Sequence, residues 1–246
     1  MGINNFADKT FEEYSSKYTL NETMISKLAE LLKDFMTTPT KTIKRIEMNE
    51  SLPMSFDWRD RGAVTKARDQ YECGSCYAID CYYSRNKYHT WGCTGGMPYR
   101  VYDYVKDNNG ISKASDYPNE SKDGECHLQR EKFPIYMIGY GIIDTNSEET
   151  LEQAQINYGP IVVALDGGHE SFQRYSSGIY YDKTCSSMVT THSVLLVEYG
   201  SDNGNDYWIL KNSFGNYWGD SGFFKLSRNC GSHCGIIRMP LFPILK

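Results

Sequence analysis

The chain has 246 residues, a formal net charge of −5 at pH 7 and an isoelectric point near 5.6. This acidic balance argues against a nucleic-acid-binding protein, which would need a basic face. Apolar residues make up 40% of the chain, enough for a sizeable core. No apolar run approaches the ~18 residues of a membrane span, so no span is expected.

The cysteine content indicates an oxidising compartment. Eight cysteines in a chain of this size favour disulfides and therefore an oxidising compartment. N-x-S/T tripeptides at Asn21, Asn49 and Asn119 are consistent with a secretory route, although such tripeptides also arise by chance. The N-terminus lacks the basic-then-apolar region of a signal peptide, which we interpret as loss of the true start.

The first half of the chain contains helical patterns. Over residues 11–36 apolar side chains recur at helical spacing, which predicts helices. "TTPTKT" and "MNESLP" then predict an exposed link, with a globular segment beginning near Leu52. Residues 98–107, closed by "NNG", are predicted to form a short helix.

The C-terminal third has a different pattern. Short apolar or alternating runs stand between glycine-rich turns and predict strands: "YGPIVVALD", "HSVLLVEYG", "NDYWILKNS" and "GFFKLSR". A helix-rich half followed by a strand-rich half predicts an α+β chain in two lobes, the second a twisted antiparallel sheet or barrel.

Four residues could together perform thiol chemistry. An attacking thiolate needs a base, the base needs a group that holds its tautomer, and the developing oxyanion needs donors. Cys76 follows "CGS", Gln70 lies six residues before it, His192 precedes an apolar strand, and Asn212 lies in "KNSFG". His192 alone would fit a satisfied core histidine, but its strand and the later Asn212 favour catalysis. The other histidines match no catalytic position: His89, His127, His169 and His233.

These stretches resemble papain-like cysteine proteases, and the cathepsin L branch in particular. Six motifs occur in order: "QYECGSC", "GCTGG", "GPIVVALDGGHESFQRYSSGIY", "THSVLLVEYG", "YWILKNSFGNYWGDSGFF" and "HCGI". "SFDWRDRGAVT" resembles the start of a mature enzyme, and "GINNFADKTFEE" resembles the second half of the family's inhibitory propeptide. The resemblance covers nearly the whole chain. It implies an endopeptidase that acts on protein or peptide chains without a cofactor or metal.

The resemblance also implies a role for each candidate residue. Cys76 would be the nucleophile, His192 its general base and acid, and Asn212 the residue that orients His192. The Gln70 side chain and the Cys76 backbone N–H would form the oxyanion hole. Substrate-binding residues are implied as well: Gly95 and Gly96 as a backbone edge, and an apolar pocket of Met97, Pro98, Gly167 and Met239. Such a pocket predicts a bulky apolar residue two positions before the cleaved bond.

Disulfides and domains follow from the same resemblance. The family pattern pairs Cys73 with Cys93, Cys81 with Cys126 and Cys185 with Cys234. This leaves Cys76 free, and Cys230 as an extra free thiol. Residues 1–51 would be a helical propeptide remnant that binds the chain's own active site. Residues 52–246 would be the peptidase domain, with a helical left lobe at about 57–133 and a β-barrel-like right lobe at about 134–246.

The chain departs from the family pattern after Cys76. Only "YAID" separates Cys76 from Cys81. The family has a long buried helix of ~20 residues at this point, so roughly 25 residues, the helix and a short segment after it, are missing by that resemblance. Each buried side chain lost with it is worth ~1.5–3 kcal/mol. A substitute helix, "CYAIDCYYSRNKYH", is the alternative, in which case Cys81 could leave Cys126.

Smaller departures surround the other candidates. Tyr77 and Phe214 stand where the family has tryptophans, and these are mild changes. Thr191 and Ser193 differ around His192. Glu198 replaces a glycine in an apolar strand and would be costly unless it faces out or is paired.

Several alternatives stay open. "CGSC" and "CGSHC" could be the two halves of a zinc site, and "CGSC" alone could be a redox motif, although six ordered motifs weigh against both. The missing helix weighs against activity. A catalytically inactive homologue that acts as a binding protein is therefore one alternative. An inhibitory role for residues 1–50 is another, and an incomplete gene model is a third.

Overall fold

The computed structural model describes residues 4, 6, 8–19, 23, 26, 42–43, 52–77, 90–124, 135–143 and 147–245. Its helices are α1 (Phe11–Tyr18), α3 (Pro98–Asp107), α4 (Glu148–Tyr158) and α5 (Glu170–Gln173), with short 3₁₀ turns at Gly92–Thr94 and His233–Gly235. Its strands are β1 (Thr42–Ile43), β2 (Phe56–Asp57), β3 (Met137–Ile143), β4 (Ile161–Leu165), β5 (Ile179–Tyr180), β6 (His192–Asp202), β7 (Asn205–Lys211), β8 (Phe223–Ser227) and β9 (Leu241–Leu245).

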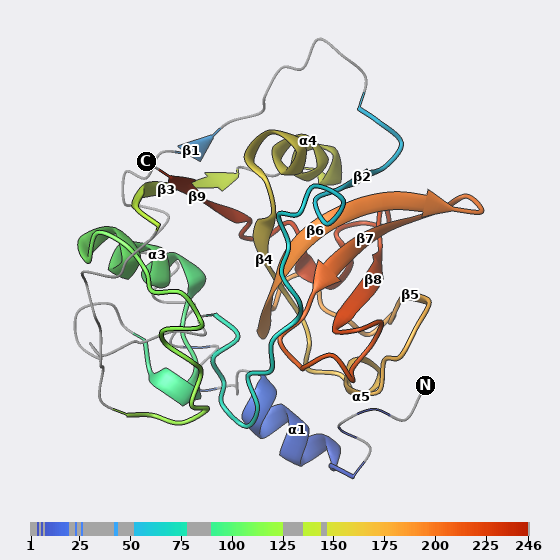
Figure 1. Cartoon of the computed structure of the whole chain (residues 1–246). Coiled ribbons are helices and arrows are strands. Elements are labelled where there is room, and N and C mark those ends of the chain that lie inside the picture. The colour runs from blue at the N-terminus through green and yellow to red at the C-terminus, as the bar shows by residue number, and fades with distance from the viewer. Residues whose placement is uncertain are drawn as a thin grey trace.

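One sheet organises the second half of the chain. Among the described residues its strand order is β1-β3-β9-β4-β6-β7-β8-β5, and β2 pairs with β6 beside this path. All pairs are antiparallel except β1 with β3 and β5 with β8. In Figure 1 the β6–β7 hairpin extends away from the body of the molecule, and α4 lies over one end of the sheet. The four strands predicted from the sequence are confirmed as β4, β6, β7 and β8.

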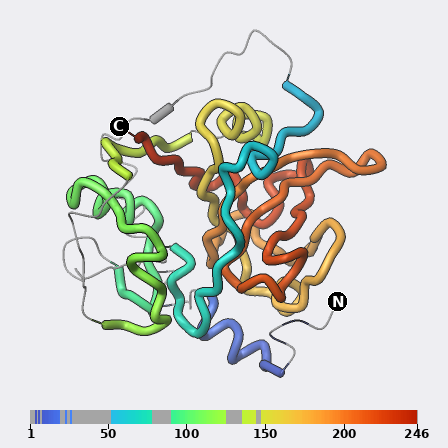
Figure 2. Tube along the Cα trace, in the orientation of Figure 1, coloured from blue at the N-terminus to red at the C-terminus, as the bar shows by residue number. Residues whose placement is uncertain are grey.

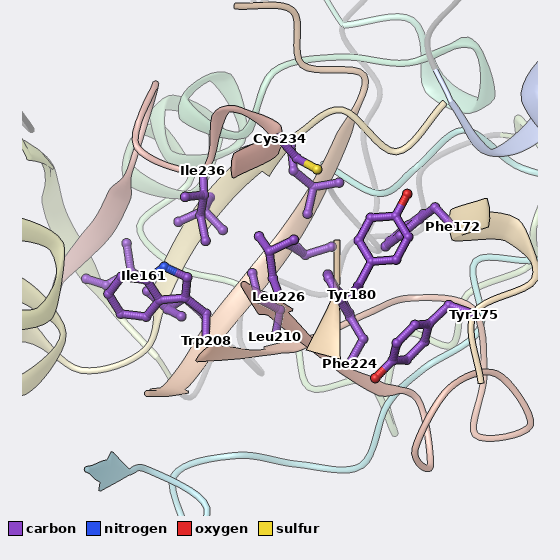
Figure 3. Packing of buried hydrophobic residues seen from close by; sticks show 14 of the residues in the cluster. Ile161, Phe172, Tyr175, Tyr180, Trp208, Leu210, Phe224, Leu226, Cys234 and Ile236 are labelled. Carbon is purple, nitrogen blue, oxygen red and sulfur yellow. The ribbon is translucent and has the colours of Figure 1, made fainter. Parts of the chain in front are cut away.

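The main core lies against this sheet. Side chains from β4, β7 and β8 meet aromatic residues of the segment 172–180, as Figure 3 shows around Trp208, Leu210 and Phe224. Trp208 is fully buried, and its indole N–H donates to Glu148 Oε2 of α4 at 2.9 Å. The same carboxylate accepts from the backbone N–H groups of Asn229 and Ser232. A buried acid thereby ties α4 to the chain that follows β8.

The first lobe is built from fewer described elements. Figure 2 shows α3 and the turn at Gly92–Thr94 on the side of the molecule opposite the β6–β7 hairpin. Helix α3 begins at Pro98, where the missing N–H of proline costs nothing, and ends at Asn108–Gly110, where Asn109 has φ 58°. Its buried residues belong to two small clusters: Met97, Tyr99, Met239 and Leu241 in one, Tyr104, Val105 and Met137 in the other. The predicted helix at 98–107 is confirmed.

Helix α1 begins within the predicted helical stretch 11–36. Thr10 caps its N-terminus by accepting from Glu13 N, and the Glu13 carboxylate accepts from Thr10 N, so the two residues form a capping box. Tyr14 and Tyr18 bury the apolar face in the same core cluster as the sheet. Most of residues 20–41 lie outside the described residues, so the rest of that predicted helical stretch stays a prediction.

The start of the predicted peptidase domain adds the short strand β2 to the sheet. Phe56 and Asp57 pair with Tyr199 and Glu198 of β6, so the first residues assigned to the left lobe lie on the right-lobe sheet. Glu198, the departure expected to be costly, is paired with the guanidinium of Arg59. Among the described helices, none is long and apolar enough to cross a membrane.

Candidate active site

His192 is the first residue of β6 and pairs with Leu165 at the end of β4. The adjoining backbone is held closely: Thr191 N donates to Leu165 O, and Gly167 N donates to the Thr191 hydroxyl at 3.0 Å. A side chain at Gly167 would place its Cβ 2.9 Å from His192 Cβ, so only glycine fits there without a shift. The sheet and this tight loop therefore fix where the imidazole lies.

Asn212 follows the last residue of β7 and faces His192. Its Oδ1 accepts from His192 Nε2 at 2.7 Å and from Ser213 N at 2.8 Å. Because an amide oxygen only accepts, the Nε2 of His192 carries the proton and the neutral ring keeps its lone pair on Nδ1. Nδ1 is buried and makes no well-formed hydrogen bond with any described residue. This is the tautomer that a general base working through Nδ1 requires.

Phe214 shields this hydrogen bond from solvent. Its ring centroid lies 4.8 Å from that of His192, and its side chain is fully buried. Three aromatic rings of the N-terminal segment then surround Phe214 edge-to-face: Phe6, Tyr14 and Tyr18, at centroid distances of 5.2, 5.9 and 5.4 Å. The replacement of a family tryptophan by Phe214 is accordingly accommodated in a closed aromatic cluster.

The same segment covers the imidazole. The backbone of Tyr18 approaches the ring of His192, and the phenol of Tyr14 donates to Gly167 O at 3.1 Å. Burial lowers the pKa of His192 to about 4, outweighing the hydrogen bond to Asn212, which raises it. In this covered state His192 is therefore neutral throughout the range in which most enzymes work.

Cys76 contacts Ser193, the residue that follows His192 in the chain. Burial raises the pKa of the Cys76 thiol to about 11, although the backbone N–H and hydroxyl of Ser193 hydrogen-bond to the sulfur and act in the opposite direction. Cys76 is a free thiol. The structure thus places His192 against Asn212, and Cys76 against the residue that follows His192, with a neutral thiol and a neutral imidazole.

Gln70 joins the two sides of the site. Its backbone N–H donates to Ser213 O at 2.8 Å, and its side-chain oxygen accepts from the Ser213 hydroxyl. Its Nε2 donates to Cys73 O at 2.9 Å, which leaves the second hydrogen of the amide for another acceptor. The fully buried Gln70 is therefore anchored to the residue next to Asn212 and to the half-cystine before Cys76.

The candidate substrate-binding residues come from three separate segments of the chain, around Gly96, Gly167 and Met239. Gly95 has φ 117°, and a Cβ on Gly96 would come within 2.5 Å of the Tyr77 ring, so glycine is needed at both positions. Met97 and Met239 pack in one buried cluster, and Pro98 starts α3 directly beside it. Gly167 lies against His192.

Two of the three predicted disulfides are present. Cys73 pairs with Cys93, and Cys185 pairs with Cys234. Among the described cysteines Cys76 and Cys230 are free, as the family pattern implies. The pairing of Cys81 with Cys126, and the substitute helix in residues 78–89, lie outside the described residues.

The zinc and redox interpretations are wrong for this fold. Cys73 and Cys234, one from each supposed half-site, are each bonded to another cysteine, so neither offers a thiolate. His169 and His233 lie near Cys185, but His169 Nε2 is paired with Asp166 Oδ2 at 2.8 Å and His233 Nε2 accepts from Asp182 N. Both histidines have structural partners. His89 and His127 lie outside the described residues.

Sequence reasoning missed two contacts at the site. The sulfur of Cys76 is contacted by Ser193, whereas Ser193 was noted only as a departure from the pattern. The phenol of Tyr14 reaches Gly167 across 153 positions in sequence, and no local signal announces such a contact. Only the assignment of "GINNFADKTFEE" to a propeptide hinted that this segment would lie at the site.

Comparisons with known proteins identify the family of this chain. Residues 52–80 and 78–244 match the sequence model described as papain family cysteine protease. The chain therefore belongs to the papain family of cysteine proteases and has its α+β fold. It is similar to cathepsin S of Bos taurus, with 35% identity covering 99% of this chain and 77% of that protein.

Two further relatives have digestive roles in their names. Digestive cysteine proteinase 2 of Homarus americanus is 34% identical over 271 aligned positions, covering 100% of this chain and 80% of that protein. The solved structure of the digestive procathepsin L2 proteinase from Tenebrio molitor larval midgut matches with a TM-score of 0.85 and 32% identity, covering 100% of this chain and 84% of that one.

Proposed function

We propose that this chain is built as a precursor of a cathepsin L-type endopeptidase with a Cys76–His192–Asn212 site. The observation that carries the proposal is the 2.7 Å bond from His192 Nε2 to Asn212 Oδ1. It leaves the lone pair on Nδ1, and Cys76 contacts Ser193, the residue that follows His192 in the chain. These contacts support a site in which a thiol, a base in the correct tautomer and an orienting amide act together.

The proposed reaction is acyl transfer followed by hydrolysis. His192 Nδ1 takes the proton of Cys76, and the thiolate attacks the substrate carbonyl carbon. The oxyanion accepts from the free amide hydrogen of Gln70 and from the Cys76 backbone N–H. The imidazolium then gives its proton to the leaving amine, and water activated by His192 hydrolyses the thioester.

Substrate recognition would use the residues around α3 and β9. Gly95 already exchanges backbone hydrogen bonds with Gly92 and Trp91, so pairing with an extended substrate falls mainly to Gly96. Met97 and Met239, with Pro98 beside them, support a pocket for a bulky apolar side chain two residues before the cleaved bond. Gly167, which lies against His192, is proposed to complete the same pocket.

Residues 1–51 are proposed to be the propeptide remnant and residues 52–246 the peptidase domain, with lobes at about 57–133 and 134–246. Supporting this division, Phe6, Tyr14 and Tyr18 pack on Phe214, and the backbone of Tyr18 approaches His192. Their burial of the site opposes the thiolate–imidazolium pair that attack requires, because both charged forms are disfavoured without water. Removal of this cover should move both pKa values toward ionisation of the pair.

Activity is proposed to be impaired by the missing helix after Cys76. The family match divides into two stretches that meet at residues 78–80, directly after Cys76. The 271 aligned positions shared with the Homarus americanus relative exceed the 246 residues of this chain, which supports an internal gap. The second candidate function, favoured by the neutral and covered state of Cys76, is an inactive homologue that acts as a binding or inhibitory protein.

The proposed location is a lysosome or the extracellular space. Support comes from the disulfides Cys73–Cys93 and Cys185–Cys234 and from relatives named as cathepsins and digestive proteinases. Protein or peptide chains are the proposed substrates, and the chain's own residues 1–51 the proposed intramolecular partner.

Active-site labelling with a thiol-reactive peptide tests the proposal. All variants carry Cys230→Ser so that the second free thiol of the described residues does not react, and mass spectrometry locates the label. We expect labelling at Cys76 that increases when residues 1–51 are removed and that His192→Asn suppresses. A folded chain whose Cys76 stays inert after this removal would instead support the inactive homologue.

A further inference from the structure

One motif noted in the sequence has no part in the proposed catalytic site. The tripeptide Asn119–Glu120–Ser121 is the described one of the three N-x-S/T sequons, since Asn21 and Asn49 lie outside the described residues. Asn119 and Glu120 are both exposed, on the connection between α3 and β3. A glycan acceptor must be exposed in the folded chain, because the attached sugar is bulky and fully hydrated.

The backbone around Asn119 forms a compact turn that presents its side chain. Ser121 N donates to Asn119 Oδ1 at 3.0 Å, and Ser121 has φ 56°. Two residues on, Asp123 Oδ1 accepts from Cys93 N at 2.9 Å, which holds the turn against the chain that leads to Gly95. The carboxylate of Glu120 contacts Lys122, so it points along the turn.

The amide of Asn119 also reaches the loop that carries Gln70. Its Nδ2 donates to Asp69 O at 3.2 Å, and this nitrogen has a second hydrogen that could be replaced by a sugar carbon. Asp69 is bridged to Phe214, and Tyr71 N donates to Asp69 Oδ1. Asn119 therefore stands one residue from the proposed oxyanion-hole amide, on the outer side of its loop.

We propose that Asn119 is the acceptor of an N-linked glycan that stands beside the Asp69–Cys73 loop and limits how large partners approach it. Nδ2 forms a bond to C1 of the first sugar of a lipid-linked pyrophosphate oligosaccharide. The C1–oxygen bond to the pyrophosphate breaks, the lipid pyrophosphate leaves with the bonding electrons, and Nδ2 releases one proton. The effect on substrates rests on the proposed function, whereas the modification itself does not.

Expression of the full chain behind a secretion signal in insect cells tests the modification. Every variant carries Asn21→Gln and Asn49→Gln, so that Asn119 is the remaining sequon. Peptide-N-glycosidase treatment followed by peptide mass mapping should show conversion of residue 119 to aspartate. Ser121→Ala should abolish this conversion and Ser121→Thr should keep it. Unmodified Asn119 in chains whose signal has been removed, in cells or in medium, would overturn the proposal.

A second measurement tests the effect on the loop. An endoglycosidase that leaves one sugar on Asn119 avoids the new charge of an aspartate. Trimming should speed backbone hydrogen exchange in residues 69–73 and raise cleavage of a folded protein substrate several-fold, with cleavage of a short peptide unchanged. Unchanged exchange would overturn the steric effect. If neither substrate is cleaved but exchange still responds, the proposed catalytic function fails while the glycan proposal stands.

Discussion

His192 and Cys76, the two residues proposed to react, are supported in different ways. His192 starts a strand that is paired on both sides, with β4 and with β7, and Asn212 follows the latter. Cys76 stands on irregular backbone whose described supports are the Cys73–Cys93 disulfide, Tyr77 packed on Gly96, and Ser193 at its sulfur. The position of His192 thus depends on many contacts within the sheet, whereas the position of Cys76 depends on a few separate contacts.

The largest expected effect concerns the two clusters of buried side chains, the main cluster and the small one that contains Met97. Leu210 and Leu241 are both fully buried, but Leu210 belongs to the main cluster and Leu241 to the small cluster with Met97 and Met239. Leu210→Ala should cost about 3–5 kcal/mol of unfolding free energy and Leu241→Ala about 2–3 kcal/mol, because a smaller cluster collapses more easily around a cavity. Urea unfolding of both variants measures the difference. Equal losses would mean that the small cluster around Leu241 resists collapse as strongly as the main cluster does.

The second prediction concerns removal of the Cys73–Cys93 disulfide, which lies close to Cys76 in sequence. Cys73→Ala with Cys93→Ala opens a loop of 20 residues and should cost about 3 kcal/mol, while Cys185→Ala with Cys234→Ala opens 49 and should cost about 4 kcal/mol. Despite its smaller cost, the first change should alter the labelling rate of Cys76 more, because Gln70 bonds to Cys73 O. A larger change in labelling after loss of Cys185–Cys234 would reverse the comparison.

The sequence predicted the sheet side of the site more fully than the rest. His192 and Asn212 lie in strands with clear apolar patterns and turns, so local signals place them. Helix α4 was not predicted, because its buried side chains include Glu148, Glu152 and Gln155, which hide the apolar period of a helix. Their partners, such as Trp208 for Glu148, are distant in sequence.

The covering of His192 could not be predicted from local patterns either, because the residues that cover it are also distant in sequence. The pattern at residues 11–36 indicated a helix, and the resemblance indicated a propeptide, but neither identified which rings would meet Phe214. The contact of Tyr14 with Gly167 depends on how two distant segments dock. The sequence likewise flagged Glu198 as costly unless paired, and left open that Arg59 would pair with it.

The third prediction tests the acidic pair at the edge of the His192 sheet. Asp57 and Glu198 face each other across β2 and β6 and share Arg59, so one guanidinium serves two carboxylates. Burial, followed by the repulsion of Asp57, raises the pKa of Glu198 from 4.5 to about 7 despite Arg59. The folded state thus holds a proton that the unfolded state loses, so stability is full below about pH 4.5 and falls as the pH rises to about 7.

The decline should amount to about 1–2 kcal/mol, after allowance for solvent screening at this partly exposed site. Glu198→Gln should flatten the unfolding free energy between these pH values, and Asp57→Asn should reduce the slope by removing the opposing charge. Denaturant unfolding at several pH values measures both. A slope that Glu198→Gln leaves intact would assign the decline to other groups.

The smallest expected effect concerns the N-terminal segment that covers His192. Tyr14→Phe keeps the ring against Phe214 but removes the hydroxyl that donates to Gly167 O, next to His192. Loss of this buried bond should cost about 1 kcal/mol and loosen α1 by the same amount. Since about 1.4 kcal/mol is a factor of ten, labelling of Cys76 should speed up roughly fivefold. Tyr217→Phe, at a ring that is 80% exposed, is the matched control and should change nothing. If Tyr14→Phe leaves the labelling rate unaltered, access to Cys76 is limited on its own side of the site and not by the segment that covers His192.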